Sequence, residues 1–348
     1  MGSICSNRAF GSITAAGRIW PAGIVSIALA MAAVAVPSAA WCAGGTNLWV
    51  ASYSTAEIQQ YSASQLKKSG NPVPLKLTVP DFTTGIAFDK KSNLWALIYD
   101  DVSKKYELVE FSKAQLKALK SMPDPIPVVV ITSDAFGEPG GINFDKQGNL
   151  WIVDEGNFLF KFSVAQLSGG SGNDTPAVTI SSPDFDDPYF VVFDKSGSAW
   201  VDNYDSDTVV KFTLGQLTSS GSPGAAVVIG SSDFDGPGEI AFDQKGNLWV
   251  PNYQGDTVLM FTKMQIASSG SPAPTVILTK DINDSLDHPW GIAFLGANLA
   301  VVNYDTGTIS KYASSQLKTS GSPTPKVFLN QSTGAASDNS QVTAGPSS

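Results

Sequence analysis

The sequence repeats itself about every fifty residues, and this period constrains the fold more than any other feature. The repeat is marked by the tripeptide Asn-Leu-Trp and its variants, which end at Trp49, Trp95, Trp151, Trp200, Trp249 and, in altered form, Ala300. Successive markers lie 46, 56, 49, 49 and 51 residues apart. Such a period indicates an architecture in which each copy buries its apolar face against its neighbours.

Each copy contains four short segments with the composition of strands. In the copy spanning residues 238–278, one ends at Phe242, and the others are residues 248–252, 257–261 and 275–278. They are rich in β-branched and aromatic residues, which favour strands. Four strands in a unit of this length are typical of a propeller blade. The sequence therefore predicts an all-β fold, a six-bladed β-propeller of four-stranded antiparallel blades over residues 44–330.

A Ser/Thr-x-x-Gln motif follows the third strand segment in most copies, for example at residues 112–115 and 262–265. This spacing is that of a capping box, which begins a helix. A glycine stands five residues after the Gln at Gly70, Gly221, Gly270 and Gly321, where a left-handed residue would end a helical turn. The motif predicts short helical turns on the outer edges of the blades, covering the edge strands.

The six copies provide only five complete inner strands, because the first copy begins directly with its second strand. In the third and fourth copies, thirteen residues separate the end of the fourth strand from the Phe of the next inner strand. Thirteen residues after Leu329 comes Val342, so residues 341–344 are candidates for a strand that closes the ring. The alternative is that the Ser/Gly-rich residues 331–348 are a disordered tail.

The N-terminus has the features of a targeting segment. Arg8 and Arg18 precede an apolar run over residues 22–36, which is short for a membrane span. We interpret residues 1–43 as a signal peptide, with an uncleaved anchor as the alternative, and expect an exported protein, periplasmic or extracellular, with no membrane span after cleavage. Cleavage at the small residues 38–40 would remove Cys5 and leave Cys42 as the single thiol, which excludes a disulfide framework and a thiolate metal site.

The charge of the chain limits its partners. The net charge is −9, although residues 1–43 contain two arginines and no acidic residue, so the remainder is more acidic still. An acidic surface repels phosphate backbones, and nucleic acid is therefore not expected as a partner. Acidic concave surfaces attract cations.

Two recurring residues of the repeat, an Asp and a Trp, are expected to have structural roles and not to form a functional site. An Asp follows the inner strand at Asp89, Asp145, Asp194 and Asp243, before a turn whose amides a carboxylate commonly binds. The Trp recurs at one position of each blade, which predicts packing between the blades.

Oxygen-bearing side chains recur at the predicted ends of the second strands. The copies carry Ser52, Ile98, Asp154, Asn203, Asn252 and Asn303 at this position. In a propeller these ends share a face with the loops between blades, which are acidic here. Such oxygen ligands would suit Ca²⁺ in the central channel. The alternative is that the loop acids are solvated and the Asn side chains cap the strand ends.

Four residues depart from the repeat near the predicted inner rim. Glu138, Asp187 and His288 each precede the Pro that opens an inner strand, and Glu239 replaces the usual Gly inside an inner strand. A carboxylate facing the channel would need water, a cation or a partner, and His288 offers a metal ligand or general base. No catalytic residue is assigned, and the candidate ligand- or metal-binding residues are Glu138, Asp154, Asp187, Asn203, Glu239, Asn252, His288 and Asn303.

The unit P-x-G-I-A-F-D-x-x-G-N-L-W-V-x-N-Y-x-x-x-T-V-x-x-F resembles NHL-repeat propellers over residues 45–329. More loosely it is similar to the gluconolactonase-like, senescence-marker-protein superfamily of six-bladed propellers and to streptogramin B lyases. The resemblance implies the propeller fold, which hosts both enzymes and binding modules.

Two departures from these families count against an enzyme. Gluconolactonase-type enzymes place a metal-binding Asp or Asn just before the Gly of an inner strand, where this chain has Thr84, Gly140, Tyr189, Gly238 and Trp290. Streptogramin lyases use more than one His, and His288 is the single histidine of the sequence.

We therefore expect a ligand- or protein-binding or scaffold module that acts through its acidic channel face. The alternative is a metal-dependent lactonase, another hydrolase, or a lyase on small substrates. It would use a Ca²⁺-like ion as Lewis acid beside Glu239, with His288 as base. A purely structural exported protein is the third interpretation.

Overall fold

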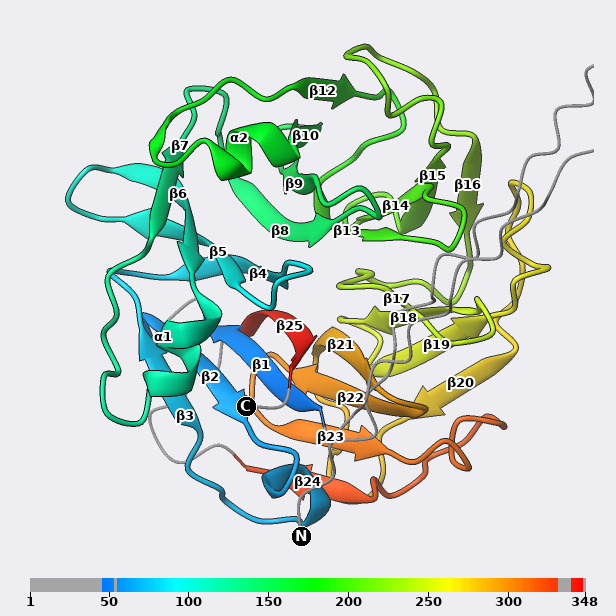
Figure 1. Cartoon of the computed structure of the whole chain (residues 1–348). Helices are drawn as coiled ribbons and strands as arrows, with labels where there is room; N and C mark the ends of the chain where they lie inside the picture. Colours follow the sequence, from blue (N-terminus) through cyan, green and yellow to red (C-terminus); the bar gives the residue numbers. More distant parts are fainter. Residues whose placement is uncertain (1–45, 53–54, 331–338, 347–348) are drawn as a thin grey trace, which may run out of the picture. The chain divides into compact units, whose positions relative to one another are not determined.

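The computed structural model describes residues 46–52, 55–330 and 339–346, and this part of the chain forms six β-sheets around a common centre (Figure 1). The fold is a six-bladed β-propeller of four-stranded antiparallel blades, as the repeat predicts, and the outer edge of blade 2 gains a two-residue parallel strand, β11 (Gly172–Asn173). The predicted signal peptide lies outside the described residues. Within them, no helix is both long enough and apolar enough to cross a membrane.

The blades share one strand order from the channel outward. Blade 1 consists of β25 (Asn339–Gly345), β1 (Asn47–Ser52), β2 (Glu57–Tyr61) and β3 (Leu75–Thr78); blade 2 of β4 (Thr83–Phe88), β5 (Leu94–Asp100), β6 (Lys105–Phe111) and β7 (Val129–Thr132); and blade 3 of β8 (Pro139–Phe144), β9 (Leu150–Asp154), β10 (Phe158–Phe162) and β12 (Val178–Ser181). Blade 4 consists of β13 (Pro188–Phe193), β14 (Ala199–Asn203), β15 (Thr208–Phe212) and β16 (Val227–Gly230); blade 5 of β17 (Ala241–Phe242), β18 (Leu248–Asn252), β19 (Thr257–Phe261) and β20 (Val276–Thr279); and blade 6 of β21 (Pro289–Leu295), β22 (Asn298–Asn303), β23 (Ile309–Tyr312) and β24 (Val327–Leu329).

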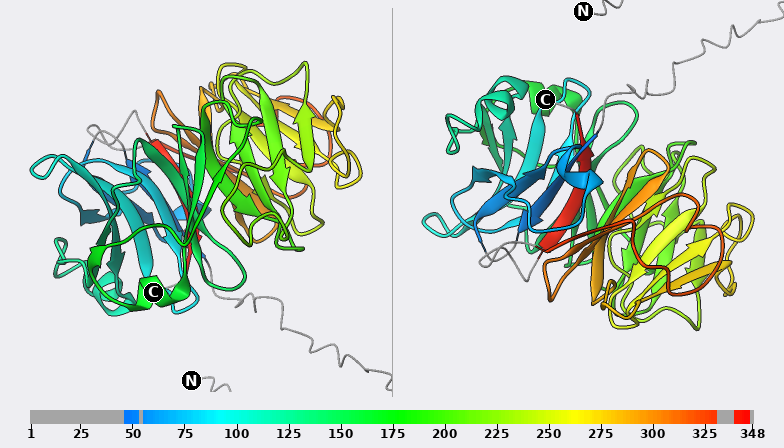
Figure 2. Two further views of the ribbon diagram at one scale, coloured as in Figure 1. Left: turned by 90° about the horizontal axis from the view of Figure 1, so that it is seen from above. Right: turned by 90° about the horizontal axis from the view of Figure 1, so that it is seen from below.

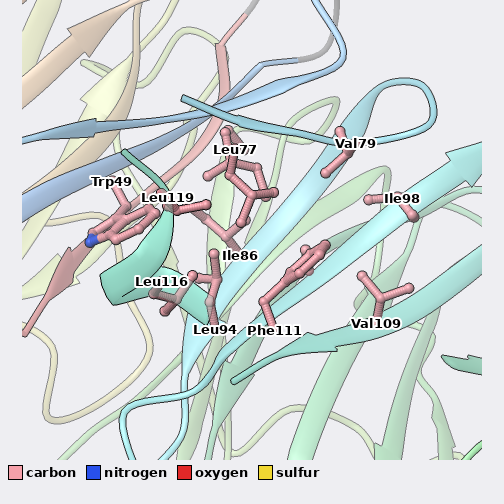
Figure 3. Close-up of a cluster of buried hydrophobic side chains, with 13 residues drawn as sticks. Trp49, Leu77, Val79, Ile86, Leu94, Ile98, Val109, Phe111, Leu116 and Leu119 are labelled. Atoms are coloured by element: carbon pink, nitrogen blue, oxygen red, sulfur yellow. The ribbon is translucent and has the colours of Figure 1, made fainter. Parts of the chain in front are cut away.

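The recurring tryptophans pack between blades, as predicted. Each is at most 2% exposed, and each meets the inner-strand Phe of the next blade with ring centroids 5.5–6.4 Å apart. Figure 3 shows Trp49 at one such joint, beside Ile86 and Leu94 of blade 2. At the joint between blades 6 and 1, Ala300 takes the Trp position and Ala344 the Phe position, and both lie in one apolar cluster. The missing Trp is therefore matched by a missing Phe.

The C-terminal segment closes the ring. Strand β25 pairs antiparallel with β1 as the inner strand of blade 1, and Figures 1 and 2 show these two ends of the described chain side by side. The predicted register is wrong by two residues. Ala344 pairs with Leu48 as Phe242 pairs with Leu248, so Ala344 and not Val342 stands at the Phe position.

The inner strand of blade 5 is shorter than predicted, and Glu239 lies just outside it. Strand β17 contains only Ala241–Phe242. The carbonyl of Pro251 accepts from Gly238 at 3.0 Å, but Pro251 has no N–H to return to the inner strand. The backbone N–H of Glu239 instead donates to Trp290 of blade 6, at 2.9 Å.

The capping-box motif forms short turns, but another segment covers the blade edges. Helices α1 (Lys113–Ala118) and α2 (Val164–Ser168) begin with capping boxes, and residues 65–67 form a 3₁₀ turn, η1 (Gln65–Lys67). The later glycines pair in parallel with the outer strand of the preceding blade, as Gly221 does with Ile180 and Gly270 with Ile229. Gly221 and Gly270 have no positive φ, so the prediction that a left-handed glycine ends each helical turn is wrong for these two. Gly70 and Gly321 have φ values of 142° and 147°, and they pair in the same parallel way with Leu329 and Leu278.

The recurring Asp residues bind the turns that follow them, as predicted. In blade 5, for example, Oδ1 of Asp243 accepts from the amides of Lys245 and Asn247 at 2.8 and 2.9 Å. These carboxylates are therefore parts of the hairpins.

Candidate functional site

A pocket of about 430 Å³ opens at one mouth of the central channel. Two repeat positions supply most of its lining. The residue before the inner-strand Gly position contributes Thr84, Gly140, Tyr189 and Trp290. The residue after the end of the second strand contributes Glu155, Tyr204, Tyr253 and Tyr304. Phe190 completes the lining. Because equivalent positions of four blades meet here, a set of residues far apart in sequence forms one cavity.

A backbone hydrogen bond, repeated from blade to blade, fixes the second set. The amides of Glu155, Tyr204, Tyr253 and Tyr304 donate to the carbonyls of Glu138, Asp187, Gly236 and His288, respectively, at 2.8–3.1 Å. The acceptor in each case is the residue before the Pro that opens the inner strand. The candidates Glu138, Asp187 and His288 therefore lie on the loops that form the pocket rim.

Trp290 is the centre of an aromatic cluster. It is 8% exposed, and its ring lies 5.2–6.1 Å from the rings of Tyr189, Tyr204, Tyr253 and Tyr304, centroid to centroid. The interplanar angles are 64–81°, so each of these tyrosine rings makes an edge-type contact with Trp290. Such edge-to-face pairs are the favourable arrangement for aromatic rings and hold one another in place.

Acidic groups adjoin the aromatic cluster at Tyr189. Burial, followed by the negative charges of Asp187, Glu138 and Asp154, raises the pKa of the Glu155 carboxyl to about 7. Burial and then Asp205 raise the pKa of Asp187. Burial, Glu155 and Asp187 raise the pKa of the Tyr189 hydroxyl. No lysine or arginine of the described chain lines the pocket, so these negative charges have no cationic counterpart within it.

Three large buried side chains stand one residue further along the inner strands, and one of them, Phe190, lines the pocket. Phe190, Glu239 and Gln341 stand at positions that are Gly85, Gly141 and Gly291 in the other blades. All three large side chains are 5% exposed or less. A Cβ on Gly141 would lie 2.3 Å from the ring of Phe190, so the glycine makes room for this ring.

Hydrogen bonds across the channel hold this layer together. Oε1 of Gln341 in blade 1 accepts from the amides of Ile86 and Ile142 at 2.8 and 3.3 Å, and its Nε2 donates to the carbonyl of Ile142 at 3.1 Å. Oε2 of Glu239 in blade 5 accepts from the amide of Val342 at 2.9 Å. Burial holds the pKa of the Glu239 carboxyl well above its usual range. The structure therefore places Glu239 in the joint that fastens β25, beneath the pocket.

The candidate residues at the strand ends fasten loops. Asn203, Asn252 and Asn303 are at most 2% exposed. Each accepts from a loop amide, of Asp186, Asp235 or Asp287, and donates to a loop carbonyl and a threonine hydroxyl. Asp154 similarly accepts from the amides of Gly137 and Gly156, at 2.9 and 3.0 Å. This arrangement agrees with the capping alternative for these four residues.

His288 belongs to a separate small group on the rim. Carboxylate oxygens of Asp256 and Asp287 and a ring nitrogen of His288 lie within 4.8 Å of one another. This is the one such group of acidic, histidine or cysteine ligands in the described chain. Asp256 also accepts from the amide of His288 at 2.8 Å and from Lys280 at 2.9 Å. The His288 ring lies 4.8 Å from that of Tyr253, so this group adjoins the aromatic cluster.

The tyrosines and Glu155 are the site residues that the sequence prediction missed. The predicted residue is the Asn at the end of the second strand, whereas the residue that lines the pocket is the next one, the Tyr of the recurring Asn-Tyr pair. Blade 3 has Asp154-Glu155 in place of Asn-Tyr. The sequence does contain a signal for these residues: a Tyr recurs directly after the strand-end residue, and blade 3 has Glu155 at that position.

Comparisons with known proteins support the fold. No protein-family model and no curated protein matches the sequence. Among solved structures, a chain of a nidogen/laminin complex matches with a TM-score of 0.60 and 13% identity over 87% of this chain and 99% of that chain. A protein of unknown function from Bacteroides caccae matches with a TM-score of 0.57 and 10% identity over 87% and 99% of the two chains.

A streptogramin B lyase matches with a TM-score of 0.52 and 12% identity over 85% of this chain and 91% of that chain. The predicted resemblance to these propellers is thereby confirmed at the level of fold. At these identities the matches show the fold alone. The chain is a six-bladed β-propeller similar in architecture to both binding and lyase-type proteins.

Proposed function

We propose that this protein is an exported binding module that takes a small ligand into the aromatic pocket at the channel mouth. The observation that carries the proposal is the pocket itself, in which Trp290 and four tyrosines surround about 430 Å³ of space. Ligand pockets are usually concave, mostly apolar spaces of about 300–1,000 Å³ with a few polar groups that orient the ligand. The buried, hydrogen-bonded side chains of Glu239 and Gln341 at the next position of the inner strands favour capture at the mouth over passage through the channel. Export rests on the interpretation of residues 1–43.

A thermal-shift screen tests the proposal. Compounds covering organic cations, organic anions, sugars and neutral aromatic molecules are compared on the unmodified protein and on Tyr253→Leu. Exposed Phe158 provides the matched control, Phe158→Leu, outside the pocket. We expect at least one compound to raise the Tm of the unmodified protein and of the control but not of Tyr253→Leu. Equal shifts in all three proteins, or no shift with any class, would contradict the proposal.

A second candidate is a metal-assisted hydrolase or lyase. The group of Asp256, Asp287 and His288 favours it, because these residues can offer three ligands at the edge of the same pocket. Glu239 would not take part, because its carboxyl is buried beneath the pocket. Thermal melts with and without chelator, followed by a lactone hydrolysis screen, distinguish the two functions. A lower Tm with chelator together with turnover would favour the enzyme.

A further inference from the structure

We propose that the pocket ligand is an organic cation of the alkylammonium type, held against the faces of Tyr204, Tyr253 and Trp290 with Glu155 beside it. This inference rests on the proposed function and names its ligand class. In a quaternary or tertiary ammonium group the positive charge is surrounded by apolar alkyl groups, so water solvates it weakly. Aromatic rings that surround such a group attract it through their negative faces and lose little on being desolvated.

The arrangement of the rings is that of a cage. Tyr253 meets Trp290 at 81° and Tyr304 at 82°, with centroids 5.4 and 5.5 Å apart. Rings perpendicular to one another turn their faces in different directions around the pocket, and no single flat platform results. A compact, nearly spherical cation can contact several faces at once, whereas a flat ring or a sugar is best held by one broad face.

The charges around the cage fit a cation. Glu155 lines the pocket, and Asp187 and Glu138 are close enough to shift its pKa. The described lining contains no lysine or arginine that would neutralise them. An organic anion would meet the Glu155 carboxylate in a lining that offers no lysine or arginine, which disfavours anions on electrostatic grounds.

The cage is held rigidly before any ligand arrives. The amides of Tyr204 and Tyr253 are bonded to Asp187 and Gly236, at 3.0 and 2.8 Å. The hydroxyl of Tyr204 accepts from Nε2 of Gln254 at 2.9 Å. A Cβ on Gly236 would lie 2.8 Å from the Tyr204 ring, so this glycine lets the ring pack against the loop. Preorganised rings lose little conformational entropy on binding, which favours affinity for a small ligand.

Isothermal titration calorimetry at pH 8 tests the inference with a pair of probes of one shape. Choline is compared with the neutral dimethylbutanol in which carbon replaces its nitrogen. Cation–π attraction predicts that choline binds the full-length protein about tenfold more tightly than the neutral probe. Tyr253→Phe keeps the ring and should bind within about twofold of the unmodified protein, whereas Tyr253→Leu should bind choline about tenfold more weakly. Glu155→Gln should lower the affinity for choline and leave the affinity for the neutral probe unchanged.

Controls separate this inference from the proposed function. Glu107→Gln removes a half-buried carboxyl outside the pocket and should bind choline as the unmodified protein does. Each variant is melted first, so that loss of fold is recognised. Equal affinity for the two probes, lost in Tyr253→Leu, would overturn the cation class and leave a ligand pocket standing. Absence of choline binding also overturns the inference, and the compound screen then decides whether the pocket binds another class.

Discussion

Neighbouring residues at the ends of the second strands have separate tasks. Asn252 is buried and fastens the loop before blade 5, while Tyr253, one residue later, is half-buried and lines the pocket. The same division holds for Asn303 and Tyr304. The rigid asparagine therefore positions the residue that meets the ligand. Glu155 is the one acidic residue among the four that the pocket receives from this position.

The titration of Glu155 predicts pH-dependent binding. Burial, and then the negative charges of Asp187, Glu138 and Asp154, disfavour the charge of this carboxyl and raise its pKa to about 7. Its charge therefore appears as the pH rises from 6 to 8. An added charge about 4 Å from a cation contributes about 1 kcal/mol in water, so choline affinity should rise about fivefold over this range. Isothermal titration calorimetry at pH 6, 7 and 8 measures this change in choline affinity. A rise of equal size in Glu155→Gln would assign the effect to another group.

The buried carboxyls of Glu239 and Asp202 predict a pH-dependent stability. Burial raises both pKa values well above the ordinary 4.5 and 3.8. The folded protein then keeps protons that the unfolded chain releases, so stability falls as the pH rises above these ordinary values towards the folded ones. We expect the Tm to decrease between pH 5 and pH 8. Glu239→Gln should reduce this slope, because its amide oxygen can still accept from Val342 without becoming charged.

Removal of the Glu239 carboxyl has a different effect from its neutralisation. In Glu239→Ala the buried amide of Val342 loses its acceptor, which should cost about 1–3 kcal/mol at all pH values. Denaturant unfolding at pH 5 and pH 8 compares the two variants. Equal loss of stability in the alanine and glutamine variants would contradict the assigned role of this side chain.

At the scale of elements, strand β25 determines whether the ring is closed. It completes blade 1, and Gln341 and Val342 connect it to blades 2, 3 and 5. Val342 is 2% exposed and packs in the cluster that joins blades 1 and 6. The strand therefore closes the ring at its edge and fills its centre at the same time.

Truncation after Asn330 should destabilise the protein strongly. It removes burial of Val342, worth about 1.5–3 kcal/mol, and two buried hydrogen-bonding groups worth about 1–3 kcal/mol each. We expect a loss of about 4 kcal/mol or more, measured by denaturant unfolding. Truncation after Pro346 is the control and should leave stability unchanged. An unaltered Tm after the longer truncation would show that β25 does not hold the ring.

At the joint between blades 6 and 1, introducing the Trp that the other joints contain should destabilise the protein. Ala300 is fully buried against Leu48 and Val342, with Ala344 at the Phe position. Ala300→Trp restores the consensus of the repeat but overfills this joint, which should cost about 1–3 kcal/mol. Val102→Trp, at a 94% exposed position, is the control in the same thermal melts. A stabilised Ala300→Trp protein would contradict the matched-alanine explanation.

At the scale of the whole molecule, the repeat predicted the fold because every blade uses the same local pattern. Trp249 and Asp243 could be assigned from sequence, since their partners lie in the same or the next copy. The register of β25 could not be assigned, because Ala344 replaces the Phe that marks the other inner strands. The pocket could not be assigned either, because its residues come from blades 2, 3, 4, 5 and 6 and meet only in the closed ring.

The role of Glu239 shows the limit of reasoning from departures from a repeat. A carboxylate in place of Gly suggested a ligand site, yet its bond to Val342 depends on a strand 103 residues later in the chain. Sequence comparison of the copies cannot reveal a contact between blade 5 and the closing strand. Glu138, Asp187 and His288 stay predictions as ligand-binding residues: their backbone carbonyls accept from the amides of Glu155, Tyr204 and Tyr304, which line the pocket.

The most direct test of the account is a crystal structure of the protein grown with tetramethylammonium. We predict density for the cation in the channel-mouth pocket, in contact with the rings of Tyr253 and Trp290, and on the side of Glu155. The layer of Glu239 and Gln341 should lie beneath it, unchanged. Density for the cation elsewhere with an empty cage, or no bound cation at a concentration that saturates choline binding in calorimetry, would contradict the account.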